Sequence, residues 1–80
     1  MRIREAVRRR IIDLCVLNNI TLNKLGTICG ITQSTLNSII NVGSKNPTVS
    51  TITKICNGLD ITVREFFNDD IFENIEQEVK

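Results

Sequence analysis

Residues 21–40 read TLNKLGTICGITQSTLNSII, and this stretch alone predicts two short helices joined by a sharp turn. Thr21 and Thr32 each precede a run of apolar residues at helical spacing, and a threonine there offers its side-chain oxygen to the free amides of the first turn. Gly30 stands between the two runs, where a glycine permits the left-handed backbone that ends a helix. We therefore expect helices over 22–29 and 33–41.

The two helices can cross closely only if the first is small where they touch. Gly26 supplies that small surface, although a glycine inside a helix costs about 0.5–1 kcal/mol relative to alanine. Five apolar residues are placed to fill the angle between the helices, namely Leu25, Cys29, Ile31, Leu36 and Ile39. The pattern indicates helix-turn-helix geometry.

The outward face of the second helix carries amides and hydroxyls and no charged side chain. Its residues are Gln33, Ser34, Asn37, Ser38 and Asn41. A solvated helix face usually includes charges, whereas amides and hydroxyls both donate and accept hydrogen bonds at base edges in the major groove of DNA. This composition favours groove reading over a polar surface helix. Because Arg and Lys are absent, we expect A·T steps or DNA shape to supply specificity.

Helical periodicity continues on both sides of this unit. Before it, residues 2–19 carry an apolar stripe of Val7, Ile11, Leu14 and Cys15. After it, residues 42–47 form a loop because Gly43 and Pro47 interrupt the pattern. Thr48 then caps a fourth helix that ends near Gly58 and whose apolar residues are Val49, Ile52, Ile55, Cys56 and Leu59.

A capping box begins a short fifth helix. Thr62 and Glu65 stand three residues apart and are followed by Phe66 and Phe67. Beyond them, residues 69–80 carry Ile71, Phe72, Ile75 and Val79 among acidic residues, and this segment is either a sixth amphipathic helix or an unpacked tail. The fold class we expect is all-α, a compact five-helix bundle over residues 1–68 followed by an acidic C-terminal segment, 69–80.

Charge is unevenly distributed along the 80 residues. Residues 1–68 hold nine basic and four acidic side chains, a net charge of +5, and residues 69–80 hold one basic and five acidic, a net charge of −4. A basic body suits a binder of polyanions, because each Lys or Arg placed against a phosphate releases condensed counterions. The run Arg8-Arg9-Arg10 fits either phosphate binding or a solvated helix face.

Several function classes are disfavoured by composition. The chain has no His, and its three cysteines, Cys15, Cys29 and Cys56, form no C-x-x-C pair, so we expect buried free thiols, no metal and no cofactor. Aromatic residues make up 4% of the chain, too few for stacking platforms that bind single strands. No apolar run of about 18 residues exists to span a membrane. We therefore expect a cytoplasmic protein. Because no nucleophile is paired with a base, we also expect that it is not an enzyme.

Three segments together resemble a known family. GITQSTL at 30–36, SKNPT at 44–48 and DITVREFF at 60–67 are similar to the helix-turn-helix domain of the Cro and phage-repressor type, the XRE family, over roughly residues 6–68. The resemblance implies a five-helix bundle whose third helix enters the major groove, usually as part of a dimer on a two-fold operator.

The resemblance also assigns roles by position. It implies base contacts by Gln33, Ser34, Asn37 and Ser38, with Gln33 the best candidate for a bidentate contact to adenine. It implies phosphate contacts by Thr21, Thr32, Lys45 and Asn46. Leu22 stands where many members have a glutamine that reaches a phosphate, so that contact is missing here.

Two functions from different classes follow. The first is a sequence-specific transcriptional regulator, a repressor that binds double-stranded DNA as a homodimer and has no evident small-molecule ligand. The second is a protein-interaction module, such as an antitoxin or adaptor, that binds its partner through the C-terminal segment. Its anchors would be Ile71, Phe72, Ile75 and Val79, and the same residues could serve homodimerisation.

Overall fold

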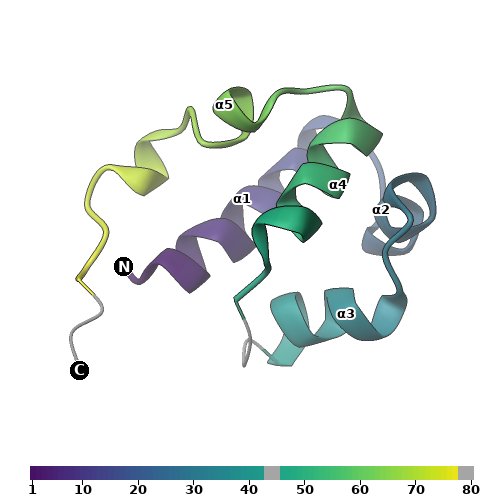
Figure 1. Cartoon of the computed structure of the whole chain (residues 1–80), viewed down its shortest axis with the longest axis horizontal. Coiled ribbons are helices and arrows are strands. Elements are labelled where there is room, and N and C mark those ends of the chain that lie inside the picture. Colours follow the sequence, from purple (N-terminus) through teal and green to yellow (C-terminus); the bar gives the residue numbers. More distant parts are fainter. Residues whose placement is uncertain (43–45, 78–80) are drawn as a thin grey trace.

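The computed structural model describes residues 1–42 and 46–77. These residues form helices and turns and contain no strand, which confirms the predicted all-α fold. Figure 1 shows α1 and α4 crossing at the centre, with α3 and α5 on opposite sides of them. The elements are α1 (Ile3–Leu17), α2 (Leu22–Cys29), α3 (Gln33–Asn37), the π turn η1 (Ser38–Val42), α4 (Val49–Leu59), α5 (Val63–Phe66) and the 3-10 turn η2 (Asp70–Phe72).

Threonine side chains begin four of the helices, as the sequence predicts. In each case the hydroxyl oxygen accepts a hydrogen bond from the backbone N–H three residues later, at 3.0–3.2 Å. These caps are Thr21, Thr32, Thr48 and Thr62. At α5 the capping box is complete, because the backbone N–H of Thr62 also donates to Glu65 Oε1 at 2.9 Å.

The core is aliphatic and is closed by one phenylalanine. The predicted stripe of α1 is buried, and Phe66 and Ile55 are fully enclosed. Val49, which the sequence assigns to the apolar face of its helix, is exposed by 76% instead, and Ile28 in α2 is exposed by 42%. Val49 is the first residue of α4 and lies a full turn before Ile52, which is the residue that reaches the core. At the end of α2, Cys29 takes the buried position next to Ile28.

The three cysteines are buried and unpaired, as predicted. The Cys29 thiol donates a weak hydrogen bond to the Ile55 carbonyl at 3.7 Å, which ties α2 to α4. Burial raises the pKa of each thiol above its ordinary value, because desolvation disfavours the thiolate. These side chains therefore behave as small core residues.

Gly58 lies in the last turn of α4, close to the predicted end of that helix. α4 continues to Leu59, and Asp60 takes the left-handed conformation that closes it, with φ of 58°. A Cβ atom added at Gly58 would overlap Cys29 Sγ. The glycine is therefore needed for the close approach of α2 to α4 and not for a turn.

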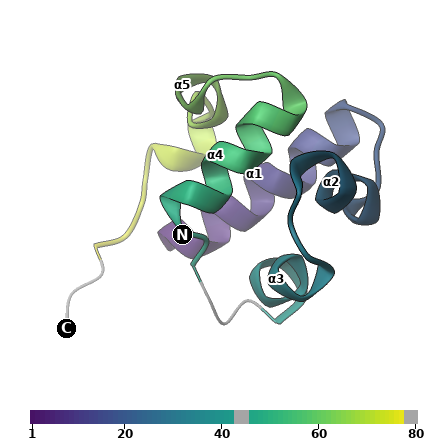
Figure 2. The ribbon, with the colours of Figure 1, turned by 45° about the vertical axis from the view of Figure 1, so that its right-hand side comes forward.

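The C-terminal segment matches neither of the two predicted forms within the described residues. Asp69 Oδ1 accepts the backbone N–H of Ile71 at 2.9 Å and begins a single 3-10 turn, η2. Phe72 then packs on Phe67 with ring centroids 4.9 Å apart. Further on, the backbone N–H of Glu76 bonds to the Met1 carbonyl at 3.0 Å. The segment thus folds back over the start of α1 (Figure 2), because its apolar and backbone groups find partners there.

Candidate nucleic-acid interface

The turn between α2 and α3 is built on two glycines. Gly30 has φ of 69° and ends α2, and the backbone N–H of Ile31 bonds to the Gly26 carbonyl at 2.9 Å. A Cβ atom at Gly26 would lie 2.9 Å from the Ile31 carbonyl oxygen and 2.6 Å from Gln33 Nε2. The absence of a side chain at Gly26 therefore lets α3 start against α2 and leaves room for the amide of Gln33.

The inner face of α3 and η1 packs against the rest of the bundle. Leu36, Ile39 and Ile40 are exposed by only 1%, 3% and 4%. The sequence predicts one regular helix over 33–41, but the α-helix ends at Asn37 and the chain continues through the π turn η1. A π turn rotates successive residues by a smaller angle than an α-helix does, so the adjacent Ile39 and Ile40 both reach the core.

The outer face carries the predicted base-reading residues. Gln33, Ser34 and Asn37 are exposed, and Ser38 is half-buried with its hydroxyl donating to the Ser34 carbonyl at 3.1 Å. The structure thus brings all four onto one helix. Asn41, which the sequence placed on this face but not among the base-reading residues, lies beside them, and its Nδ2 donates to Asn37 Oδ1 at 2.7 Å. The spacing of four residues between the two asparagines is the signal that would have found this contact.

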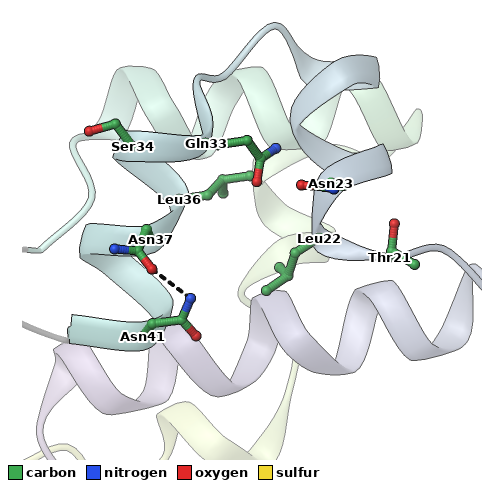
Figure 3. Close-up of a pocket in the computed structure, with 8 residues that line it drawn as sticks. All are labelled: Thr21, Leu22, Asn23, Gln33, Ser34, Leu36, Asn37 and Asn41. Carbon is green, nitrogen blue, oxygen red and sulfur yellow. Dashed lines mark hydrogen bonds between the residues drawn. The ribbon is translucent and has the colours of Figure 1, made fainter.

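Together, α3 and η1 (residues 33–42) form a ridge between two hollows. The larger has a volume of about 650 Å³ and is shared with the first turn of α2 (Figure 3); its lining residues are Thr21, Leu22, Asn23, Gln33, Ser34, Leu36, Asn37 and Asn41. The smaller, about 220 Å³, is shared with the start of α4 and is lined by Ser34, Thr35, Ser38, Ile39, Asn46, Pro47, Thr48 and Thr51. Among the residues that the structure describes, neither lining contains a charged side chain.

Three of the four predicted phosphate-binding residues lie at helix starts or beside this ridge. Thr21 and Thr32 are exposed caps of α2 and α3, and Asn46 is exposed at the smaller hollow. Lys45 lies outside the described residues. The free N–H groups of a helix start point toward solvent, so these positions are chemically suited to an anion.

Two arginines of the basic run hold backbone carbonyls. Arg8 Nε donates to the Ile40 carbonyl in η1 at 2.7 Å. Arg10 donates to the Phe66 and Glu65 carbonyls at the end of α5, at 2.7 and 2.9 Å, and pairs with Asp69 at 3.3 Å. Both therefore satisfy acceptors that a helix end leaves without a partner. Sequence reasoning offered only phosphate binding or a solvated face for these side chains.

The residues predicted to anchor a partner take different positions. Phe72 packs within the molecule against Phe66 and Phe67. Ile71 and Ile75 are half-buried, and Val79 lies outside the described residues. No helix in the ranges 1–42 and 46–77 has the length and apolar character needed to cross a membrane.

Comparison with known proteins bears on this geometry. A family model described as helix-turn-helix matches residues 11–66, which is more than half of the chain. A crystal structure of prophage Lp1 protein 11 is similar, with a TM-score of 0.81 and 34% sequence identity over 94% of this chain and 100% of that one. No curated protein matches. The chain therefore belongs to the XRE-type helix-turn-helix family, a family of DNA-binding regulators.

Proposed function

We propose that this protein is a sequence-specific repressor that inserts the ridge formed by α3 and η1 into the major groove of double-stranded DNA. The observation that carries the proposal is the outer face of that ridge, where Gln33, Ser34 and Asn37 are exposed and uncharged. Side chains of this kind match the donors and acceptors of base edges. Gln33 has an amide long enough for a bidentate contact to adenine.

The shape of the ridge supports the same proposal. Two hollows flank α3, so a helix entering a groove would leave room on each side for a sugar-phosphate backbone. Thr21 lines the larger hollow, and Asn46 lines the smaller one. Thr32 caps the start of the ridge. We assign phosphate contacts to these residues and to Lys45, and base contacts to Gln33, Ser34, Asn37 and Ser38.

Net charge supports polyanion binding by the body of the protein. Residues 1–68 carry +5, whereas the acidic residues gather in the C-terminal segment, which lies along the start of α1. Figures 1 and 2 both place residues 69–77 on the side of the molecule away from α2, so their negative charge is kept from one flank of the ridge. This separation favours approach of DNA to the helix-turn-helix unit.

We further assign a homodimer as the binding form, acting in the cytoplasm. A two-fold dimer presents two copies of the ridge to half-sites about one helical turn apart, which is how this class of domain usually docks. Repression follows if the operator overlaps a promoter.

Selection from random duplex DNA tests the proposal. The purified protein is mixed with a pool of random duplexes near physiological salt, and the retained molecules are sequenced. We expect an inverted repeat with half-sites about one helical turn apart. Affinity for the selected duplex should fall steeply as salt rises, because phosphate contacts release counterions. Retention of no sequence above background would contradict the proposal.

Matched variants connect the binding to Gln33. Gln33→Ala should cost about 1–3 kcal/mol of affinity and relax the preference at one base position. Gln77→Ala is the control, because Gln77 is also exposed and lies in the C-terminal segment. Equal affinity of Gln33→Ala and the unmodified protein would remove Gln33 from the interface.

Lys45→Ala should weaken binding to all sequences alike and lower the magnitude of the salt slope by about one.

A further inference from the structure

We infer that Asn41 is a positioning residue that turns Asn37 into a hydrogen-bond donor for guanine. The inference rests on the proposed DNA-reading function and adds to it a residue and a base. Asn41 Nδ2 donates to Asn37 Oδ1 at 2.7 Å, and both side chains are exposed on the ridge (Figure 3). The amide of Asn37 is therefore already held by a neighbour before DNA arrives.

The hydrogen bond selects which end of the Asn37 amide faces outward. A bidentate contact to adenine needs the oxygen and the amino group of one amide to face the same base, since adenine presents a donor at N6 and an acceptor at N7. In this protein the Asn37 oxygen is directed at Asn41. The oxygen keeps a second lone pair, but its bond to Asn41 fixes its direction, and the amino group is the end of the amide with two hydrogens still to give.

Guanine is the base whose edge suits such a group. It presents two adjacent acceptors in the major groove, N7 and O6, whereas adenine presents one acceptor beside an amino group. An outward amino group on Asn37 would meet the N6 amino group of adenine donor against donor. The pair thus supplies a guanine contact on a helix that has no arginine or lysine between residues 33 and 41, and for which the sequence favoured A·T steps or DNA shape instead.

Asn41 lies four residues after Asn37, a spacing that places two side chains on the same face of a helix. Within η1, Ile39 and Ile40 are buried, whereas Asn41 is exposed. Arg8 holds this backbone, because its Nε donates to the carbonyl of Ile40, the residue before Asn41.

The test compares base preferences of three variants by selection from random duplex DNA. Asn37→Ala identifies the position that Asn37 reads, which is the position whose preference it loses. There we expect the unmodified protein to favour guanine over adenine by about tenfold, in the range of a good bidentate contact. Asn41→Ala frees the Asn37 oxygen and should reduce this preference to less than about threefold or reverse it toward adenine. Asn57→Ala, an exposed change on α4, should leave the preference intact.

The outcomes separate this inference from the proposed function. If the unmodified protein selects a site but prefers adenine or cytosine at the Asn37 position, the inference is overturned and the DNA-binding proposal stands. The same holds if Asn41→Ala leaves the guanine preference unchanged, or if Asn37→Ala changes no position. If the unmodified protein selects no DNA, both fail. Thermal melting of each variant confirms folding, which is expected because both asparagines are exposed.

Discussion

The first half of the recognition helix, Gln33–Asn37, starts from a threonine cap one residue before it, whereas the second half, Ser38–Val42, is held by an arginine 32 positions earlier in the chain. α5 repeats the contrast: its start is the Thr62–Glu65 capping box, and its end bonds to Arg10, 56 positions away from Phe66. Helix starts in this protein are encoded locally, and two of its helix ends are completed by α1.

The largest effect is expected where α3 starts against α2. Gly26→Ala should destabilise the protein by about 2 kcal/mol, because the added Cβ meets the Ile31 carbonyl oxygen and overpacks the crossing. Thr27→Ala, at the next and exposed position of α2, is the control and should be nearly neutral. Urea unfolding measures both. A Gly26→Ala protein as stable as the unmodified one would show that the turn tolerates a side chain there.

The next effect concerns the end of α5. Arg10→Ala removes the donors to the Glu65 and Phe66 carbonyls and the partner of Asp69. We expect a loss of about 1.5 kcal/mol, within the range for hydrogen bonds from charged groups. Arg9→Ala, the adjacent and exposed arginine, should change stability by less than about 0.5 kcal/mol. Equal melting curves for the two variants would show that the hydrogen bonds from Arg10 to these carbonyls do not stabilise the protein.

Removing the local cap of the recognition helix should cost less. Thr32→Ala deletes the acceptor of the Thr35 N–H and is expected to destabilise the protein by about 1 kcal/mol. Thr32→Ser keeps the oxygen and should restore most of that stability. Thermal unfolding of the pair sharpens the comparison. If serine fails to rescue, the threonine methyl group rather than the cap is what matters.

The smallest effect on global stability belongs to Arg8. Arg8→Ala removes one hydrogen bond to the Ile40 carbonyl, and we expect a cost of about 0.5–1 kcal/mol. Amide hydrogen exchange is the sharper readout, because protection should fall in Ser38–Val42 while Gln33–Asn37 keeps its own. Uniform loss of protection along both halves would show that they behave as one unit.

The sequence predicts the parts of the fold that depend on nearby residues. The four threonine caps, the left-handed Gly30 and the buried stripe of α1 are all confirmed, because a cap or a periodic face is visible within one or two turns of chain. The position of Gly26 was also predictable, since a crossing of two short helices needs a small residue.

The remaining features depend on contacts that span much of the chain. Nothing local to Arg8 or Arg10 indicates that each reaches a carbonyl more than 30 positions away. The same reason explains the π turn, which follows from burying two adjacent isoleucines, and the C-terminal segment, which folds on Phe66, Phe67 and Met1. For the candidate site, residue types identified the face, and the structure added the hydrogen bond between Asn41 and Asn37.

The most direct test of the account is to map the contact surface by NMR. The ¹⁵N-labelled protein is titrated with its selected duplex, and shifts are followed for backbone and side-chain amides. We predict that the largest changes fall on the side-chain amides of Gln33, Asn37 and Asn41 and on backbone amides at the starts of α2 and α3. Changes confined to residues 71–75, with those amides unmoved, would contradict it and favour a protein-interaction module.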